Sequence, residues 1–253
     1  MISIITPHYN GSNFHEHFFN SLIKQTFIDW ELIVVDDCSD KPHYLNLKKK
    51  VSKDSRFNLF RNESNKGVSF SRNKGLSKAK GSFIAFLDID DIWHIDKLNF
   101  QYNIMINDSI DFCCTAFTIV NEKSKILGYS KYTKQFNINN FLKFNINIAC
   151  SSVMLRKESI ITKFDESMSH AEDYLFWGEI LNNKKFNSFL IKDPKYLIYL
   201  KSINSLSSNK FKQLAGVFKA NYKLVGFLRA FYFTPFYIIN SLKRLFDLKT
   251  RKL

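Results

Sequence analysis

Three polar segments directly follow apolar runs, and they contain the side chains best suited to catalysis. The segments are residues 6–10 (TPHYN), 36–39 (DDCS) and 88–93 (DIDDIW). Parallel strands end at a common edge of a sheet, so we expect the three segments to converge there. Five carboxylates at one edge repel one another unless a cation or hydrogen-bond donors lie between them. A bound metal ion is therefore the simplest expectation.

Asp88 and Asp90 are the expected metal ligands. Alternate residues of an extended segment point to the same side, so these carboxylates can share Mg²⁺ or Mn²⁺ with a diphosphate. The metal would neutralise charge that builds on a leaving nucleotide diphosphate. Asp-x-Asp also occurs in ordinary surface loops, but its position directly after a buried strand favours the metal site.

Other polar residues at this edge suit a nucleotide. Asp37 can accept the ring N–H of a pyrimidine base, and Tyr9 can lie against the face of that base. Asp36 is instead predicted to cap a helix. Arg72 opens a helix and is expected on the diphosphate side, the alternative being an ordinary basic helix start.

His15 and His17 occupy alternate positions of a predicted helix. Alternate helix positions point to different faces, so we expect two solvent-exposed histidines and no metal site there.

The chain alternates between predicted strands and helices. Residues 2–6 and 32–35 are apolar runs typical of strands buried on both faces, and the helix between them is predicted to begin with Asn13 as its cap. This βαβ pattern predicts an open, twisted α/β sheet that becomes mixed in the second half. The further predicted strands are residues 57–60, 83–87, 112–120 and 151–155, and the further helices lie around residues 71–80 and from Asp173.

The combined pattern resembles the family 2 glycosyltransferases, which have the GT-A fold and include enzymes that build bacterial O-antigens and capsules. The resemblance is strong over residues 1–100 and looser over 145–210. It rests on residues 3–10 (SIITPHYN), 25–27 (QTF), 31–39 (ELIVVDDCS), 65–69 (NKGVS), 71–75 (SRNKG), 86–93 (FLDIDDIW) and 169–177 (SHAEDYLFW).

The resemblance implies a Rossmann-like GT-A domain over residues 1–210, with a nucleotide-binding half (1–100) and an acceptor half (101–210). Asp173 matches the aspartate that deprotonates the acceptor hydroxyl, although an aspartate at a helix start also suits capping. The implied nucleotide-sugar ligands are Thr6, Pro7, Tyr9, Asp37, Arg72, Asp88, Asp90 and Asp91, and the acceptor-side residues are Trp93, His170 and Glu172.

The implied reaction is inverting transfer of a sugar from UDP-galactose or UDP-glucose to a hydroxyl of a lipid-linked oligosaccharide. The alternative is an inactive scaffolding relative or a sugar-nucleotide-binding protein of the same assembly pathway. The family often places an arginine near position 201, where this chain has Lys201. That lysine is a candidate replacement for the diphosphate contact.

Composition narrows the function classes. The net charge of +14 favours anionic partners, or else reflects a lysine-rich surface. A nucleic-acid binder is disfavoured because the clustered carboxylates would repel phosphate. A sugar-nucleotide pyrophosphorylase is disfavoured because residues 6–10 are not a glycine-rich phosphate loop. The four cysteines lack zinc-ligand or disulfide spacing and are expected to be reduced.

Residues 211–253 form a predicted helical tail rich in aromatic and basic side chains. Its apolar stretch is shorter than the roughly 20 residues that a spanning helix needs. We expect it to lie on an anionic membrane surface, with packing on the catalytic domain as the alternative. No secretory signal is apparent at the amino terminus. The expected location is therefore cytoplasmic, at the inner face of the membrane.

Overall fold

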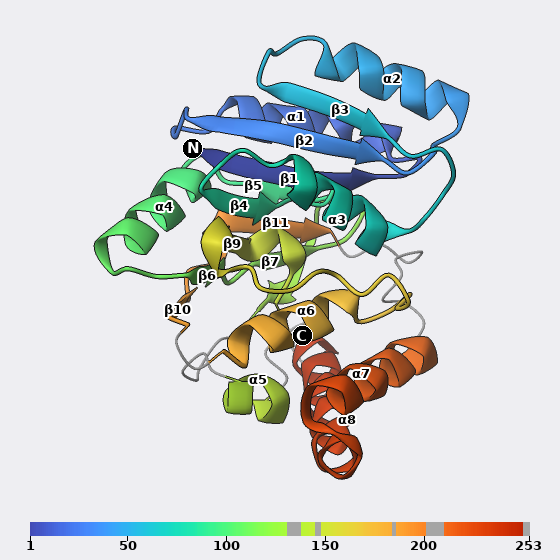
Figure 1. Ribbon diagram of the computed structural model, residues 1–253, viewed down its shortest axis with the longest axis vertical. Helices are drawn as coiled ribbons and strands as arrows, with labels where there is room; N and C mark the ends of the chain where they lie inside the picture. Colours follow the sequence, from blue (N-terminus) through green and yellow to red (C-terminus); the bar gives the residue numbers. More distant parts are fainter. Residues whose placement is uncertain (131–137, 145–147, 184–185, 201–209, 250–253) are drawn as a thin grey trace.

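The computed structural model describes residues 1–130, 138–144, 148–183, 186–200 and 210–249. The fold is a mixed α/β structure built around a seven-stranded sheet with the strand order β10-β6-β9-β4-β1-β2-β3 (Figure 1). The strands are β1 (Ile2–His8), β2 (Trp30–Asp36), β3 (Phe57–Arg61), β4 (Phe83–Phe86), β6 (Phe112–Thr115), β9 (Val153–Arg156) and β10 (Ser188–Ile191).

All neighbouring strands of this sheet pair in parallel except β9, which is antiparallel to both β4 and β6. The sequence therefore predicted the mixed sheet correctly. β1 and β2 are buried along nearly their whole length, which explains their apolar composition.

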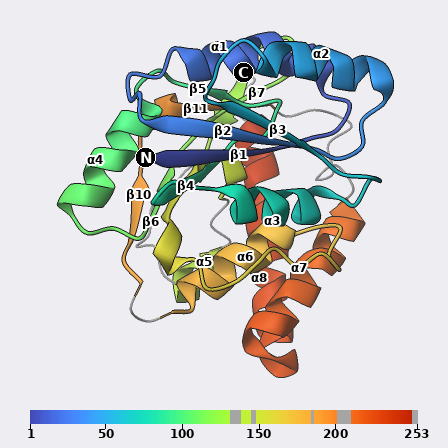
Figure 2. The ribbon, with the colours of Figure 1, turned by 45° about the horizontal axis from the view of Figure 1, so that its top comes forward.

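Helices cover both faces of the sheet. Figure 2 shows α1 and α2 on one side of β1–β3, and α3 and α6 on the other. The helices of this part are α1 (His15–Ile23), α2 (Lys41–Val51), α3 (Val68–Lys78), α4 (Lys97–Asn107), α5 (Ile138–Phe144) and α6 (Glu172–Leu181).

A second sheet with the order β5-β11-β7-β8 lies beside the first. It comprises β5 (Ile92–Trp93), β7 (Thr118–Val120), β8 (Ile126–Tyr129) and β11 (Leu197–Leu200). The single strand predicted over residues 112–120 is thus wrong, because the chain leaves the first sheet after Thr115 and enters the second at Thr118. The backbone N–H of Ala116 still donates to the carbonyl of Ile191 at the end of β10. The polypeptide then passes from the first sheet to the second between Ala116 and Thr118.

Two local predictions about the first helix are wrong. Asn13 lies in a short 3₁₀ turn, and α1 starts at His15 without a side-chain cap. His15 is also buried, with 1% of its surface exposed, because its ring faces His8 and not solvent. His17 is exposed, as predicted.

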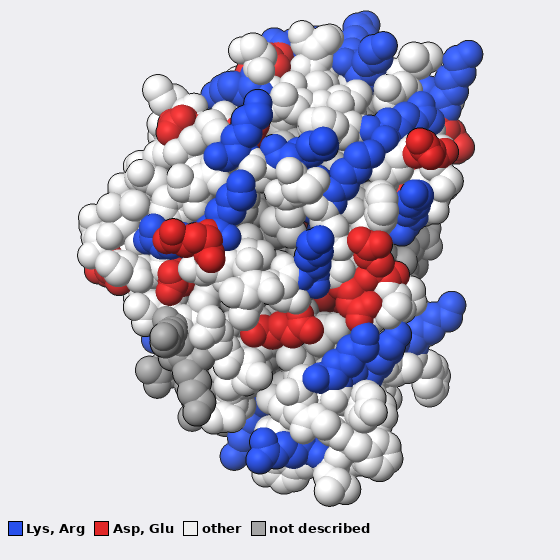
Figure 3. Space-filling model, in the orientation of Figure 1, with Lys and Arg blue, Asp and Glu red and all other residues white. Residues whose placement is uncertain are grey.

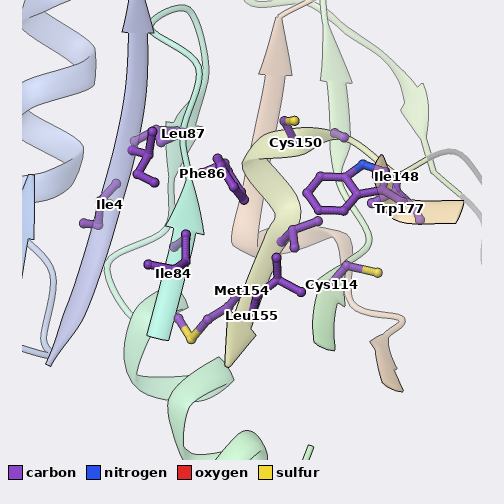
Figure 4. Close-up of a cluster of buried hydrophobic side chains, with 14 of the residues drawn as sticks. Ile4, Ile84, Phe86, Leu87, Cys114, Ile148, Cys150, Met154, Leu155 and Trp177 are labelled. Atoms are coloured by element: carbon purple, nitrogen blue, oxygen red, sulfur yellow. The ribbon is translucent and has the colours of Figure 1, made fainter. Parts of the chain in front are cut away.

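The core contains most of the cysteines. Cys113, Cys114 and Cys150 are buried free thiols, and Cys38 is half-buried and free. In Figure 4, Cys114 and Cys150 lie in the same apolar cluster as Phe86, Met154 and Trp177. The expectation of reduced cysteines agrees with this placement.

The C-terminal segment forms α7 (Lys210–Val225) and α8 (Phe227–Lys249), joined at Gly226. Gly226 has φ +81, which explains a glycine at this turn. α8 continues through Pro235. α7 packs on α6, and α8 packs on α5 and α7. None of the helices described is long and apolar enough to cross a membrane.

Candidate active site

The C-terminal ends of β4, β1 and β2 lie side by side, so the polar segments after these strands share one edge of the sheet (Figure 1). In the parallel register, His8 lies opposite Asp36 and Ile5 lies opposite Phe86. The structure thus brings together the segments around Tyr9, Asp37 and Asp88, as the sequence indicated.

Asp37 is buried and held by three donors. Asn62 donates its side-chain N–H over 2.8 Å, and the backbone N–H groups of Lys66 and Gly67 donate over 2.9 and 2.8 Å. These contacts fix the loop before α3, where Gly67 has φ +88. Asp37 is therefore a rigid acceptor at the expected nucleoside edge.

Asp36 does not cap a helix, contrary to the prediction. α2 begins after Asp40 and has no side-chain cap. Asp36 instead points into the protein, where it accepts hydrogen bonds from His8 over 2.9 Å and from the backbone N–H of Ser39 over 3.2 Å. Asp36 is the last residue of β2, whereas Asp37 lies in the loop after the strand and has different hydrogen-bond partners.

The remaining expected nucleoside residues differ in accessibility. Tyr9 is 53% exposed, so its ring is available to a base. Pro7 is half-buried. Thr6 is fully buried, and its hydroxyl has no hydrogen-bond partner among the residues that the structure describes.

Arg72 connects the two halves of the site. Its guanidinium donates to Asp88 over 2.9 Å and to Glu172 over 3.1 Å, and the side chain is only 5% exposed. Glu172 is 100 residues away in the sequence. Arg72 therefore lies beside the expected diphosphate site, but both of its hydrogen-bond partners among the described residues are carboxylates of the protein.

The Asp88–Asp91 turn is anchored by residues that lie far from it in the sequence. Ser151 accepts the backbone N–H of Asp88 over 2.9 Å, and Asp91 accepts the backbone N–H of Leu200 over 3.1 Å. Asp91 is 1% exposed. Burial, followed by the nearby Asp90 and Asp88, raises the pKa of Asp91 well above its usual range. Asp91 is thus placed to fix the turn, whereas Asp88 and Asp90 are partly accessible.

Asp88 and Asp90 fit a divalent cation. Burial and the charge of Asp88 raise the pKa of Asp90 to about 6, so a second negative charge here is unfavourable without a cation. Within the described residues, no three His, Cys, Asp or Glu side chains gather as a metal site. Two carboxylates suit Mg²⁺ or Mn²⁺ when substrate phosphates and water complete the coordination.

Asp173 lies in the first turn of α6, next to Glu172. Among the residues that the structure describes, its one hydrogen-bond donor is the backbone N–H of Tyr174, over 2.7 Å. Burial and the charge of Glu172 raise the pKa of Asp173 to about 7, although Arg72 opposes this shift. The cap position belongs to Ala171, which has the left-handed angles φ 58 and ψ 26. Asp173 is therefore a carboxyl group that can exchange a proton near neutral pH.

The three expected acceptor-side residues are not equivalent. Trp93 is 2% exposed, and its indole N–H donates to the carbonyl of Ser151 over 2.7 Å. This burial leaves Trp93 no free face for an acceptor. Glu172 is buried against Arg72, while His170 is half-buried and contacts Ser169. Lys201 lies outside the described residues.

Sequence reasoning missed two residues that hold the site together. Asn62 follows β3 and binds Asp37, so extending the strand-end rule to that strand would have found it. Ser151 binds the backbone of Asp88 from a segment more than 60 residues away. No local pattern in the sequence marks Ser151.

Comparison with solved structures shows the same fold in other proteins. The S. aureus TarS fragment crystallised with UDP-GlcNAc has a TM-score of 0.71 and 21% sequence identity, with coverage of 88% of this chain and 66% of that chain. A mannosyltransferase from Pyrobaculum calidifontis in complex with GDP-Man and Mn²⁺ has a TM-score of 0.65 and 14% identity, over 88% of this chain and 63% of that one. Both similarities concern the fold, which is GT-A.

Sequence comparison reaches the family level. The UDP-Glc:alpha-D-GlcNAc-diphosphoundecaprenol beta-1,3-glucosyltransferase WfgD of Escherichia coli is 34% identical over 262 residues, covering 100% of this chain and 98% of that protein. The sequence profile of Glycosyl transferase family 2 matches residues 3–164. With the GT-A sheet and the carboxylates at its edge, these matches establish that the chain belongs to glycosyltransferase family 2.

Proposed function

We propose that this glycosyltransferase moves a hexose from a UDP-sugar, UDP-glucose or UDP-galactose, to a hydroxyl of a diphosphate-linked lipid saccharide, with inversion at the anomeric carbon. The observation that carries the proposal is the Asp88–Arg72–Glu172 bridge, which holds the expected diphosphate edge beside Asp173. The name of the WfgD relative supports both the UDP-sugar and the diphosphate-linked lipid acceptor.

The donor would lie along the edge formed by β4, β1 and β2. Tyr9 would contact the base, and Asp37 would accept its ring N–H with a lone pair that the three protein donors leave free. Asp88 and Asp90 would hold Mg²⁺ or Mn²⁺, which when bound neutralises charge on the UDP leaving group. Arg72 would keep Asp88 in place.

The acceptor hydroxyl would transfer its proton to the carboxylate of Asp173 as its oxygen attacks the anomeric carbon. The new glycosidic C–O bond forms while the bond to the diphosphate oxygen breaks, and the electron pair leaves with UDP. Attack from the face opposite UDP converts an α-linked donor into a β-linked product. Near neutral pH, a carboxyl group with a pKa of about 7 is well matched to a general base.

We place the acceptor's lipid at a membrane surface beside α7 and α8. Residues 210–242 contain five Lys or Arg and no Asp or Glu. Phe211 and Leu228 are 88% and 83% exposed. In Figure 3, the lower end, where Figure 1 places these helices, is mostly uncharged with basic groups, and the acidic groups lie higher. This pattern suits an anionic bilayer at the inner face of the cell membrane.

One experiment tests reaction class and donor together. Hydrolysis of sugar nucleotides is measured with Mg²⁺ or Mn²⁺, and the best donor is then offered with a diphosphate-linked lipid GlcNAc acceptor. We expect UDP-glucose or UDP-galactose to react and NMR to find a β-linked product. An α-linked product would contradict inversion, and a preference for a GDP-sugar would contradict the proposed nucleoside site.

The membrane surface is tested with Phe211→Gln combined with Leu228→Gln. Removing two exposed apolar side chains should weaken the affinity for phosphatidylglycerol vesicles, measured by co-sedimentation, by about 10²-fold or more, since each side chain buried in the bilayer contributes roughly 1.5–3 kcal/mol. Ile28→Gln with Ile161→Gln is the matched control, because these residues are 77% and 64% exposed on other elements. Equal losses in both double variants would argue against the α7–α8 surface.

A further inference from the structure

A buried chain of hydrogen-bonding side chains lies beneath the expected nucleoside edge, and the proposed transfer reaction does not use it. It runs from Asp36 through His8 and His15 to Asn46, linking β2, β1, α1 and α2. His8 Nδ1 is 2.9 Å from Asp36 Oδ1, the two Nε2 atoms are 3.0 Å apart, and His15 Nδ1 is 2.8 Å from Asn46 Oδ1. Both histidines are 1% exposed.

The hydrogen bonds between these side chains determine which of their atoms can carry protons. Asp36 is an anion and only accepts, because hydrogen bonds from His8 and Ser39 overcome the opposing effect of burial and lower its pKa. His8 must therefore carry a proton on Nδ1. The facing Nε2 atoms need one proton between them, because two protons would collide and two lone pairs would repel.

Two protonation states satisfy every link. When Asn46 presents its oxygen, His15 donates from Nδ1 and accepts at Nε2, so His8 must donate from both nitrogens as an imidazolium paired with Asp36. When the Asn46 amide is turned over, both histidines are neutral and His15 donates to His8. A further proton on His15 would place two N–H groups face to face and break the hydrogen bond between the two rings.

The surrounding charges decide which ring takes the first added proton. Burial, opposed by the hydrogen bond to Asn46 and reinforced by His8, Lys50 and His43, lowers the pKa of His15. Lys50 is paired with Glu16. Beside His8 lies Asp36, which also contacts Arg61 over 3.3 Å. The first proton therefore resides on His8, and the second would have to enter His15.

Hydrogen bonds connect this series of side chains to the two loops of the expected nucleoside edge. The carbonyl of His8 accepts the backbone N–H of Asp37 over 2.8 Å. Ser39 Oγ lies 3.2 Å from His8 Nδ1 and accepts the backbone N–H of Asn10 over 2.9 Å. Asn10 and Cys38 have positive φ angles of 51 and 62, which are unfavourable without such support. Tyr9 and Asp37 lie within these loops.

We propose that His8 and His15 are positioning residues for nucleotide binding, and that donor affinity falls in acid because the chain cannot accept a second added proton. The inference rests on the proposed donor site. It deepens that site by making its nucleoside edge responsive to pH through side chains that do not touch the nucleotide.

The test compares UDP binding to the wild-type protein and to His15→Gln by calorimetry, with saturating Mn²⁺, at pH 8.0 and 5.0. Glutamine can donate to His8 but cannot take up a proton. We expect the variant to bind UDP within about threefold of wild type at pH 8.0. The loss of UDP affinity between pH 8.0 and pH 5.0 should be smaller in the variant than in wild type by about fivefold or more. Protonation of the UDP phosphates and of the expected metal site affects both proteins alike. The ratio of the two losses of affinity therefore reports His15 alone.

Side-chain nitrogen NMR of the wild-type protein supplies a second readout that needs no variant. We expect the first added proton to appear on His8, with both of its nitrogens protonated, while His15 stays neutral; the signal of the exposed His17 serves as the reference. Independent ordinary titration of His8 and His15, or identical acid-side losses in the two proteins, would overturn the inference. Failure of wild type to bind UDP at pH 8.0 would instead contradict the proposed donor site.

Discussion

The first half of the chain (residues 1–100), where we expect the nucleotide, and the second half (residues 101–210), where we expect the acceptor, hold their principal carboxylates in opposite ways. Asp37, in the first half, accepts three hydrogen bonds and is held in one position. Asp173, in the second half, is buried beside Glu172, accepts the backbone N–H of Tyr174, and has a pKa raised to about 7 by burial and the charge of Glu172. The comparison indicates that donors on the protein suit a carboxylate to recognition, whereas burial with few donors suits one to proton transfer.

Asp173→Asn tests the proton-transfer side of this comparison and should have the largest effect. Asparagine keeps the size of the side chain but cannot accept the proton, so transfer should fall by about 10²- to 10⁴-fold. UDP affinity should change little, because the expected donor contacts lie on other elements. Transfer rate and UDP affinity are measured on the same preparations. Near-normal transfer would leave Asp173 a structural residue.

Asp90→Ala tests whether the first half also holds the metal. Loss of a metal ligand should weaken Mn²⁺-dependent UDP binding by roughly 10²-fold, equivalent to about 2.7 kcal/mol. The matched control is Asp91→Asn, since the raised pKa of Asp91 favours its neutral acid form, which an amide resembles. Calorimetry with Mn²⁺ and with excess chelator measures both. Equal UDP binding with and without chelator would contradict the metal site.

Asp37→Asn should lower the free energy of unfolding of the protein. The new amide N–H₂ group would face donors, leaving a buried N–H unpaired at a cost of about 1–3 kcal/mol in the free energy of unfolding. Urea denaturation measures the change, and the exposed Asp108→Asn is the control. If the two variants are equally stable, the three hydrogen bonds to Asp37 do not stabilise the loop before α3.

The pH dependence of transfer should follow Asp173. The base acts only when ionised, so at saturating donor the rate should level off above about pH 8 and fall roughly tenfold per unit below pH 7. The direction follows from the raised pKa, because protonation inactivates the base as the pH falls. The residual activity of Asp173→Asn should lack this step. A step of the same size in the variant would assign the titration to another group.

The predictability of the site differs between these same regions. Most residues after β1, β2 and β4 were identified correctly as lying at one edge, because apolar strands followed by polar residues are a local pattern. Trp93, from the same motif, proved to be buried, and nothing local distinguishes it from its accessible neighbours. The position of Asp173 at a helix start suggested a stabilised anion, but burial and the charge of Glu172 raise its pKa to about 7.

The sequence by itself determined the family, the α/β class and the strand ends that hold the site. Buried parallel strands must be apolar on both faces, and the polar residues after them must lie at the edge. Only the tertiary structure decided that Arg72 bridges Asp88 and Glu172, that Ser151 anchors Asp88, and that His15 is buried against His8. The partners in the first two cases lie 16 to 100 residues apart, and His15 is turned inward by packing against β1 and α2. Burial and hydrogen bonding depend on spatial neighbours, which local spacing does not specify.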